Sequence, residues 1–305
     1  MRTFIAAMAS RHDFAAAELE RLFNQIEPRQ QVIDAITRPA EGKPWHRYRP
    51  IFLTERRIQE GVAFRRSHAA TLERAQAVYG VPAEVITAIL GVETFYGRHR
   101  GRYKVLESLA TLAFDYPQRG KFFRSELEQF LLLTREEGLD PLSALGSYAG
   151  AMGQPQFIAS SFRRYAVDFN NDGQRDIWDE TADAIGSVAN YLGQHGWQRG
   201  AAIATRAVVT GNDYRRGVRT KARKPTTSAA LLQEHGVRPV APLAAERKAT
   251  LLALEGATGP EYWLTLDNFY VITRYNHSPL YAMAVYQLSR EIARHSTAEL
   301  AAHGR

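Results

Sequence analysis

Apolar residues recur at helical spacing through most of the chain, and this pattern predicts a mainly α fold. Helical spacing runs through residues 1 to about 75, with a break at 39–50 where proline, glycine and aromatic residues interrupt it. The strongest helical signals lie in 81–200, and a further helix is predicted at 279–295. One face of that last helix carries Tyr281, Ala284, Val285 and Leu288.

The pattern changes between about 204 and 270, where short apolar runs alternate with basic and proline-rich loops. Ala207–Val209 and Tyr270–Ile272 have the length and the β-branched content of strands. We therefore expect a small β-containing insert in an otherwise helical chain. The predicted domains are a helical N-terminal domain at 1–75, a helical core at 76–203, a small α/β domain at 204–267 and a closing segment at 268–305 that returns to the core.

One carboxylate lies in the middle of an apolar helical stripe. A helix is predicted to begin near Pro82, because proline is tolerated in the first turn. At about 100° per residue, Glu93 falls on the same face as Ile86 and Ile89. We therefore expect Glu93 to be surrounded by apolar side chains.

A carboxyl in such surroundings is a candidate catalytic acid. Desolvation disfavours its ionised form and raises its pKa, so that it stays protonated near neutral pH. A glycosidase needs such a group to protonate the leaving oxygen, as lysozyme illustrates. The spacing leaves a second interpretation open, a structural ion pair between Glu93 and Arg98, Arg100 or Arg102.

Acidic and amide residues between 168 and 179 follow the spacing of an EF-hand loop, in which Gly173 permits the sharp turn. The predicted ligands are the side chains of Asp168, Asn170, Asp172 and Asp176 and the backbone carbonyl of Gln174. Position 12 is Asp179, whose arm is shorter than the usual glutamate and weakens the expected affinity. We predict one structural Ca²⁺, for which Na⁺ could substitute. The alternative is an Asx-rich turn without metal.

Composition narrows the function further. The 305 residues include no cysteine, which excludes disulfides, thiolate chemistry and a Cys-based metal site among them, and no lipidation cysteine is visible in this sequence. No run approaches the ~18 apolar residues of a membrane span, and the apolar start at Met1–Met8 is too short for a secretory signal. We therefore expect a soluble globular protein, in whose sequence any peripheral or lipid-anchored membrane association is not visible. The formal net charge is +7, but the basic residues of 215–224 lie among loop-forming residues, so no nucleic-acid partner is predicted.

Four segments, in the same order, resemble the membrane-bound lytic murein transglycosylase B family. The first is Gly91–Gly97 (GVETFYG), which contains Glu93, and the second is Ser147–Gly153 (SYAGAMG), which continues to Ser161. The third begins with Asp168–Gly173 (DFNNDG) and ends at Tyr191, and the fourth runs from Arg274 to Val285 (RYNHSPLYAMAV). The likeness spans most of the chain after about residue 40.

This resemblance implies a goose-lysozyme-like α core that carries the active site. It also implies the substrate and the reaction: cleavage of peptidoglycan between N-acetylmuramic acid and N-acetylglucosamine without water, leaving a 1,6-anhydromuramic end. Glu93 would be the catalytic residue. Ser147 and Gln156 would contact the sugar near the scissile bond, and the saccharide would be flanked by Tyr48, Tyr275, Asn276 and Tyr281. The enzyme would act as a monomer in the periplasm or cell envelope, with no organic cofactor.

Three other functions remain open from the sequence. A hydrolytic muramidase would use Glu107 or Asp115 to activate water, since a glycosidase that relies on two carboxylates needs a second one near the first. A peptidoglycan-binding scaffold would retain the cleft without catalysis. A calcium sensor would need a large change of shape, which a lone EF-type loop makes an unfavoured interpretation.

Overall fold

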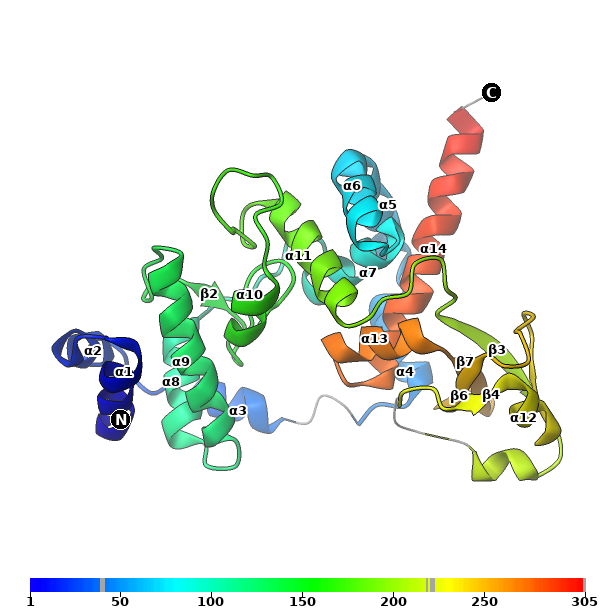
Figure 1. Cartoon of the computed structure of the whole chain (residues 1–305), viewed down its shortest axis with the longest axis horizontal. Coiled ribbons are helices and arrows are strands. Elements are labelled where there is room, and N and C mark those ends of the chain that lie inside the picture. The colour runs from blue at the N-terminus through cyan, green and yellow to red at the C-terminus, as the bar shows by residue number, and fades with distance from the viewer. Residues whose placement is uncertain (39–41, 218, 220–222, 304–305) are drawn as a thin grey trace. The chain divides into compact units, whose positions relative to one another are not determined.

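The computed structural model describes residues 1–38, 42–217, 219 and 223–303, and the chain is mainly helical, as predicted (Figure 1). It folds as two compact units. The first unit contains residues 1–40 and 97–187, and the second contains 41–96 and 188–305. Glu93 belongs to the second unit and the predicted metal loop to the first.

The first unit is built around two helices that pack against each other, α8 (Val105–Asp115) and α9 (Gly120–Glu136). Its other elements are α1 (Arg2–His12), α2 (Ala16–Phe23), α3 (Gln30–Thr37), β1 (Tyr103–Lys104), β2 (Leu145–Gly146), α10 (Ala159–Tyr165) and the first half of α11 (Thr181–Gln194). The core between α8 and α9 is apolar, with Leu106, Leu109, Phe123 and Phe130 fully buried. Strands β1 and β2 pair antiparallel.

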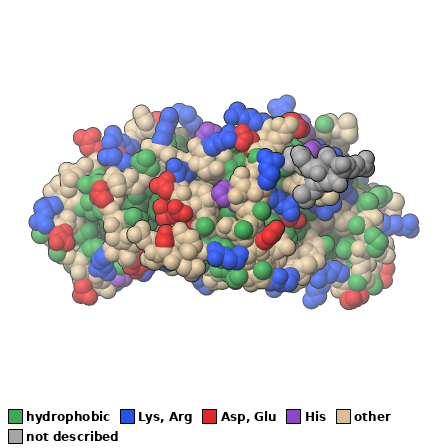
Figure 2. Space-filling model, turned by 90° about the horizontal axis from the view of Figure 1, so that it is seen from above, with side chains coloured by type: hydrophobic (Ala, Val, Ile, Leu, Met, Phe, Trp, Pro, Cys, Tyr) green, Lys and Arg blue, Asp and Glu red, His purple; other side chains and the backbone are tan. Residues whose placement is uncertain are grey.

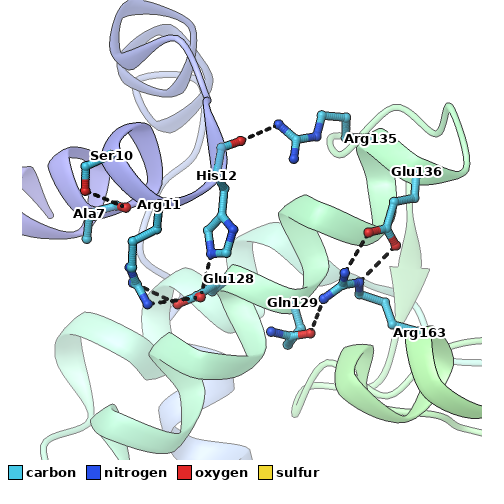
Figure 3. A network of polar contacts seen from close by, with 9 residues as sticks. All are labelled: Ala7, Ser10, Arg11, His12, Glu128, Gln129, Arg135, Glu136 and Arg163. Carbon is cyan, nitrogen blue, oxygen red and sulfur yellow. Dashed lines mark hydrogen bonds and ion pairs between the residues drawn. The ribbon is translucent and has the colours of Figure 1, made fainter.

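Ion pairs join α1 and α10 to α9 within this unit (Figure 3). Arg11 and His12 both bind Glu128, at 3.0 Å and 2.8 Å. At the C-terminal end of α9, Glu136 accepts two hydrogen bonds from Arg163 at 2.6 Å and 2.9 Å. Arg163 also lowers the pKa of Glu136 by donating to its carboxylate. These polar contacts add to the apolar packing of α1 and α10, which bury Met8 and Phe162 respectively.

The second unit is centred on α7 (Ala83–Thr94), which α5 (Glu55–Ser67), α6 (Ala69–Tyr79) and α14 (Pro279–His303) cover. Helix α4 (Trp45–Phe52) packs on α14, and α13 (Asp267–Tyr275) precedes α14. Pro82 occupies the N-cap of α7, close to the predicted start. The helix is buried on nearly every side and not only on the predicted stripe, which is typical of a central core helix.

A five-stranded antiparallel sheet completes the second unit. Its strand order is β4-β6-β7-β3-β5. The elements are β3 (Ala204–Val209), the 3₁₀ turn η1 (Asp213–Arg216), β4 (Thr227–Ser228), α12 (Ala229–Glu234), β5 (Val237–Pro239), β6 (Lys248–Glu255) and β7 (Pro260–Thr265). The sheet and α12 share a hydrophobic cluster, made of Leu232, Val237, Ala249, Leu251, Leu264 and Leu266. The predicted β-containing insert is therefore present, and Ala207–Val209 lies in β3 as expected.

Two local predictions are wrong. Tyr270–Ile272 is not a strand but part of α13, because Phe269, Val271 and Ile272 are buried as parts of one helix. A short β-branched run does not by itself distinguish a strand from a buried helix. The predicted break at 39–50 is also too long, since α4 begins at Trp45 and includes Pro50. Residues 39–41 of that break lie outside the described residues.

No single helix within the described residues has the length and apolar composition to cross a membrane. Among the described residues, α6 and α7 have the required length and apolar composition only when taken together, and the two helices are bent by 112° relative to each other. Lys and Arg side chains are spread over the face drawn in Figure 2, with Asp and Glu side chains between them.

Candidate active site

The Glu93 carboxyl lies in the last turn of α7 and accepts a hydrogen bond from α14. The hydroxyl of Tyr281 donates to Glu93 Oε1 at 2.6 Å. Tyr281 is 3% exposed, and burial first and the nearby carboxylate second raise its pKa well above 10. Its hydroxyl therefore keeps its proton at any physiological pH and remains a donor to Glu93.

The environment of Glu93 favours the protonated carboxyl. Glu93 as a whole residue is half-buried, but its carboxyl is surrounded by protein atoms. This burial raises the pKa of Glu93 from 4.5 to about 7, against the opposing effect of the Tyr281 hydrogen bond. A structural ion pair with an arginine would instead stabilise the carboxylate and lower its pKa. The raised pKa therefore favours the acid interpretation over the ion-pair interpretation.

Three of the predicted saccharide-binding tyrosines gather around this carboxyl. Tyr275 and Tyr281 lie with their rings nearly parallel, at 8° and 6.4 Å between centroids. Burial raises the pKa of Tyr275 well above 10, and the Glu93 charge raises it further. Tyr48 is close enough to Tyr281 to act on its pKa. Four residues predicted from three distant segments are therefore together in the second unit.

The chain leaves α7 through a turn that packs the Tyr96 ring against the helix at Gly91. Phe95 and Tyr96 both have positive φ, at 52° and 60°. The Tyr96 hydroxyl donates to the Arg57 carbonyl at 2.7 Å. A Cβ on Gly91 would lie 2.7 Å from the Tyr96 ring, and one on Gly61 would lie 2.4 Å from its hydroxyl. Two glycines thus make room for the ring that fixes the end of the helix bearing Glu93.

Asn276 lies next to Tyr275, where α13 ends and α14 begins. Its Oδ1 accepts a hydrogen bond from the backbone N–H of Ser278 at 3.0 Å. The carbonyl half of the side-chain amide therefore shapes the turn between the helices. The amide NH₂ half is the part suited to donate to a ligand.

Ser147 and Gln156 belong to the first unit and share one tightly folded segment there. Ser147 Oγ accepts from the N–H of Ala149 at 3.3 Å and of Ala151 at 3.0 Å, and this leaves its own hydroxyl proton for another partner. Gln156 Nε2 donates to the carbonyls of Arg100 and Gly153, so its Oε1 is the group suited to accept from a sugar hydroxyl. Both side chains are half-buried.

The predicted metal loop is internally hydrogen-bonded. Asp168 accepts from the N–H groups of Asp172 and Gly173, and Asp172 accepts from that of Gln174. Gly173 has φ +92° and supplies the sharp turn. These bonds bring the oxygens of Asp168, Asn170 and Asp172 around one turn, a donor set that suits a hard cation.

Two acidic residues of the loop have other partners. Asp176 Oδ1 accepts from the N–H groups of Trp178 and Asp179 and so caps the next turn. Asp179 pairs with Arg100 at 2.6 Å, which turns it toward that guanidinium. Within the described ranges, no group of three or more His, Cys, Asp or Glu side chains is arranged to hold a metal. A bound cation would therefore depend on Asn170 and on backbone carbonyls as well as on the carboxylates.

The carboxylates that a hydrolytic mechanism would need are both in the first unit. Glu107 is 7% exposed and accepts from Arg29 at 2.8 Å and 3.0 Å. Asp115 is exposed at the last residue of α8. The first is held in a structural ion pair and the second lies in solvent, so neither has the environment of a catalytic base.

The sequence interpretation missed two residues that support the site. Tyr191 donates from its hydroxyl to the Arg274 carbonyl, and its ring lies 4.8 Å from that of Tyr275. Asp183 is fully buried, and its carboxylate accepts from the N–H groups of Phe169, Asn170 and Asp176, which fixes the metal loop from inside. Both residues lie in the third quoted segment, but spacing could not reveal their roles. Arg274 is 83 positions from Tyr191, and the partners of Asp183 are backbone N–H groups whose directions depend on the folded loop.

Comparisons with known proteins agree with this geometry. Residues 1–290 match the family described as the transglycosylase SLT domain. The chain is 43% identical over 300 residues to membrane-bound lytic murein transglycosylase B of Escherichia coli (strain K12), covering 95% of this chain and 81% of that protein. The crystal structure of the soluble lytic transglycosylase SltB1 from Pseudomonas aeruginosa superposes with a TM-score of 0.91 at 50% identity, over 96% of this chain and 98% of that one.

Two further solved structures of relatives contain ligands. The Escherichia coli lytic transglycosylase Slt35 in complex with calcium has a TM-score of 0.89 and 42% identity, over 97% of this chain and 93% of that one. SltB3 from Pseudomonas aeruginosa in complex with NAG-NAM-pentapeptide has a TM-score of 0.85 and 35% identity, and the match covers 96% of this chain and 78% of that one. The predicted lysozyme-like α fold and peptidoglycan-cleaving class are therefore confirmed at the level of the family.

Proposed function

The chain belongs to the lytic transglycosylase family that carries the SLT domain, and on that premise we propose that Glu93 is its single catalytic acid and base. The observation that carries the proposal is the state of the Glu93 carboxyl, which has a pKa of about 7 and accepts a hydrogen bond from the Tyr281 hydroxyl at 2.6 Å. At neutral pH such a group is present in both forms. It can therefore donate a proton in one step and accept one in the next.

In the first step, protonated Glu93 donates its proton to the glycosidic oxygen between N-acetylmuramic acid and N-acetylglucosamine. The bond from C1 to that oxygen breaks, and N-acetylglucosamine leaves with a free 4-hydroxyl. The acetamido oxygen of the muramic residue stabilises the positive charge at C1. This use of the substrate's own group removes the need for a second enzymic carboxylate.

In the second step, ionised Glu93 takes the proton of the C6 hydroxyl of the same muramic residue. The C6 oxygen then bonds to C1 and closes the 1,6-anhydro ring. Glu93 ends protonated, as it began, and no water enters the product. Tyr281 orients the carboxyl in both steps.

The other predicted residues would hold the glycan strand. The rings of Tyr48 and Tyr275 offer apolar faces to the sugars, and Asn276 offers its NH₂ group. In the first unit, the Ser147 hydroxyl and Gln156 Oε1 offer neutral hydrogen bonds, which suit an uncharged saccharide. The assignments of Ser147, Gln156 and Asn276 are supported by the hydrogen bonds that orient them and by the family segments in which they lie. Tyr275 lies in the fourth of these segments, and Tyr48 is supported by its proximity to Tyr281.

We further propose that the loop at 168–176 binds one structural Ca²⁺, with Na⁺ as a substitute. The ligands would be Asp168, Asn170, Asp172 and Asp176 and the Gln174 carbonyl. Support comes from the preformed turn at Gly173 and from the calcium complex of the relative Slt35. The ion would stabilise the loop and take no part in the reaction, since Glu93 supplies the proton transfers.

We also propose that the enzyme works as a monomer on peptidoglycan strands in the periplasm, within the cell envelope where that substrate lies. The division into domains at 1–75, 76–203, 204–267 and 268–305 remains a proposal. The separate hydrophobic cluster of the sheet and α12 supports the third of these domains.

Digestion of purified peptidoglycan in oxygen-18 water tests the reaction type. A transglycosylase releases anhydro-ended fragments that carry no label, because no water is consumed. A hydrolytic muramidase releases reducing-end fragments with one labelled oxygen, which would reject the proposed mechanism. Binding of peptidoglycan without any release would favour the scaffold.

A further inference from the structure

Arg57, in the first turn of α5, contacts the ends of two other helices of the second unit. Its side chain donates from Nη1 to the carbonyl of Ile51 in the last turn of α4. Its backbone carbonyl accepts from the hydroxyl of Tyr96, which follows the end of α7. Helix α4 bears Tyr48 and α7 bears Glu93, yet the catalytic steps described above do not use Arg57.

The guanidinium of Arg57 also contacts two phenyl rings. Its central carbon lies 5.3 Å from the ring centroid of Phe52 and 5.0 Å from that of Phe95, and both separations are in the range of a cation–π contact. Phe52 in turn packs against Tyr48, with 5.1 Å between the ring centroids. Phe95 is the C-cap of α7, two residues after Glu93. A continuous row of side chains therefore runs from Tyr48 to the end of the helix that carries Glu93.

The orientation of the Arg57 side chain has an energetic cost. Arg57 is half-buried, whereas its neighbour Arg56 is exposed. Burial lowers the pKa of Arg57, and its Nε–H is buried without a hydrogen-bond partner among the described residues. A long side chain in the first turn of a helix could instead extend its charge into water. The contacts with α4 and with the end of α7 therefore offset the cost of burying this guanidinium.

The two ends of the row are not held equally. Glu93 is fixed independently of Arg57, because α7 is buried on nearly every side and Tyr281 donates to the carboxyl. Helix α4 has eight residues, of which Trp45 alone is buried, and a helix of that length is not stable by itself. The place of Tyr48 thus depends on tertiary contacts of α4, and Arg57 supplies those at its C-terminal end.

We propose that Arg57 is a positioning residue that holds Tyr48 in place relative to Glu93, so that the tyrosine ring flanks the bound sugar. Arg57 acts through its contacts with α4 and with Phe95 and does not touch the substrate. The proposal rests on the proposed function, since it concerns the same site. Its consequence is that loss of the Arg57 side chain weakens glycan binding without changing the proton transfers of Glu93.

The test measures kcat and KM separately on soluble peptidoglycan strands. Arg57→Gln keeps the backbone hydrogen bonds to Thr54 and Tyr96 but removes the cation. KM should therefore rise roughly tenfold, while kcat and the pH at which activity falls stay unchanged. Arg57→Lys keeps the charge but not the planar guanidinium, so its KM should lie between those of wild type and Arg57→Gln.

Arg56→Gln is the matched control. Arg56 is on the same helix, its guanidinium carbon lies 5.4 Å from the ring centroid of Phe95, and its replacement makes the same charge change. Because Arg56 is exposed, KM should stay at the wild-type value. Circular dichroism establishes which variants are folded, and if Arg57→Gln is unfolded the same comparison is made with Arg57→Lys.

A KM of folded Arg57→Gln within about twofold of wild type and of Arg56→Gln would overturn the proposal. So would a fall in kcat at unchanged KM, because the substitution would then act on Glu93 and not on Tyr48. A wild type that releases no anhydro-ended products would instead refute the proposed function.

A double-mutant cycle tests whether Arg57 acts through Tyr48. In Tyr48→Ala the ring that Arg57 positions is absent, so adding Arg57→Gln should raise KM by less than about twofold more. Titration of a peptidoglycan tetrasaccharide into the same variants, made in Glu93→Gln, measures affinity without turnover and should show the same pattern. If the separate effects of Arg57→Gln and Tyr48→Ala multiply in the double variant, action through Tyr48 is refuted.

Discussion

Replacing Glu93 by glutamine should stabilise the protein above neutral pH and have little effect in acid. In the unfolded chain the carboxyl ionises near pH 4.5, whereas in the folded chain it ionises only near pH 7. Between these values the folded state binds more protons than the unfolded state, so the free energy of unfolding falls as the pH rises. The contribution of the Glu93 carboxyl to the free energy of unfolding is fully present below about pH 4.5 and is lost as the pH rises through about 7.

The magnitude follows from the size of the pKa change. A rise from 4.5 to about 7 corresponds to a cost of about 3 kcal/mol for ionising the buried carboxyl. Glutamine cannot ionise, and its carbonyl can still accept the hydrogen bond of Tyr281. The free energy of unfolding of Glu93→Gln minus that of wild type should therefore increase by about 3 kcal/mol between pH 4 and pH 8.

Urea unfolding at a series of pH values, followed by tryptophan fluorescence, measures this difference. Three of the four tryptophans, Trp45, Trp197 and Trp263, lie in the second unit with Glu93. Glu84→Gln, in the first turn of the same helix, is a matched control that should change by less than about 1 kcal/mol across the range. A difference between Glu93→Gln and wild type that is independent of pH would refute the assignment of a raised pKa to Glu93.

Four further results are expected. The kcat/KM of wild type should be constant below about pH 7 and fall tenfold per pH unit above it, because the free enzyme must carry a protonated Glu93; a pH–rate profile measures this. Tyr281→Phe removes the bond that lowers the Glu93 pKa, so the alkaline limb of that profile should move to higher pH, and kcat should fall roughly tenfold. Chelation of calcium should lower the unfolding free energy of the first unit by about 2.7 kcal/mol relative to Ca²⁺ at a hundred times its Kd, and Asp168→Asn should lose most of this effect in calorimetry. Gly91→Ala should destabilise the second unit by about 1–3 kcal/mol in urea unfolding, since its Cβ would overlap the ring of Tyr96; an unchanged midpoint would contradict that packing.

The sequence was sufficient to predict the residues whose environment is set by neighbours along the chain. Glu93 could be singled out because Ile86 and Ile89 fall on the same helical face, and that helix is indeed buried. The buried face of α14 was predicted for the same reason, from Tyr281 and Leu288. Helical periodicity is local information, and a stripe of apolar residues must be buried wherever the helix packs.

Contacts between distant segments could not be derived from spacing. The hydrogen bond from Tyr281 to Glu93 joins residues 188 positions apart, and the pair that holds the Glu107 carboxylate against Arg29 spans 78. Asp179, whose short arm weakened the expected affinity for a cation, pairs with Arg100, which is 79 positions away and which the loop spacing could not indicate. The local sequence pattern indicates which residue could act at a position, whereas the residue that it contacts there depends on the tertiary fold.

The central claim is that a single carboxyl, Glu93, carries both proton transfers. The most direct test measures the initial rate of anhydro-muropeptide release by wild type, Glu93→Gln and the control Glu84→Gln, with binding to peptidoglycan measured in parallel. Loss of proton transfer should lower the Glu93→Gln rate at least about a thousandfold while binding is retained, and Glu84→Gln should keep the wild-type rate. A folded Glu93→Gln that retains more than about a tenth of the wild-type rate would contradict the claim.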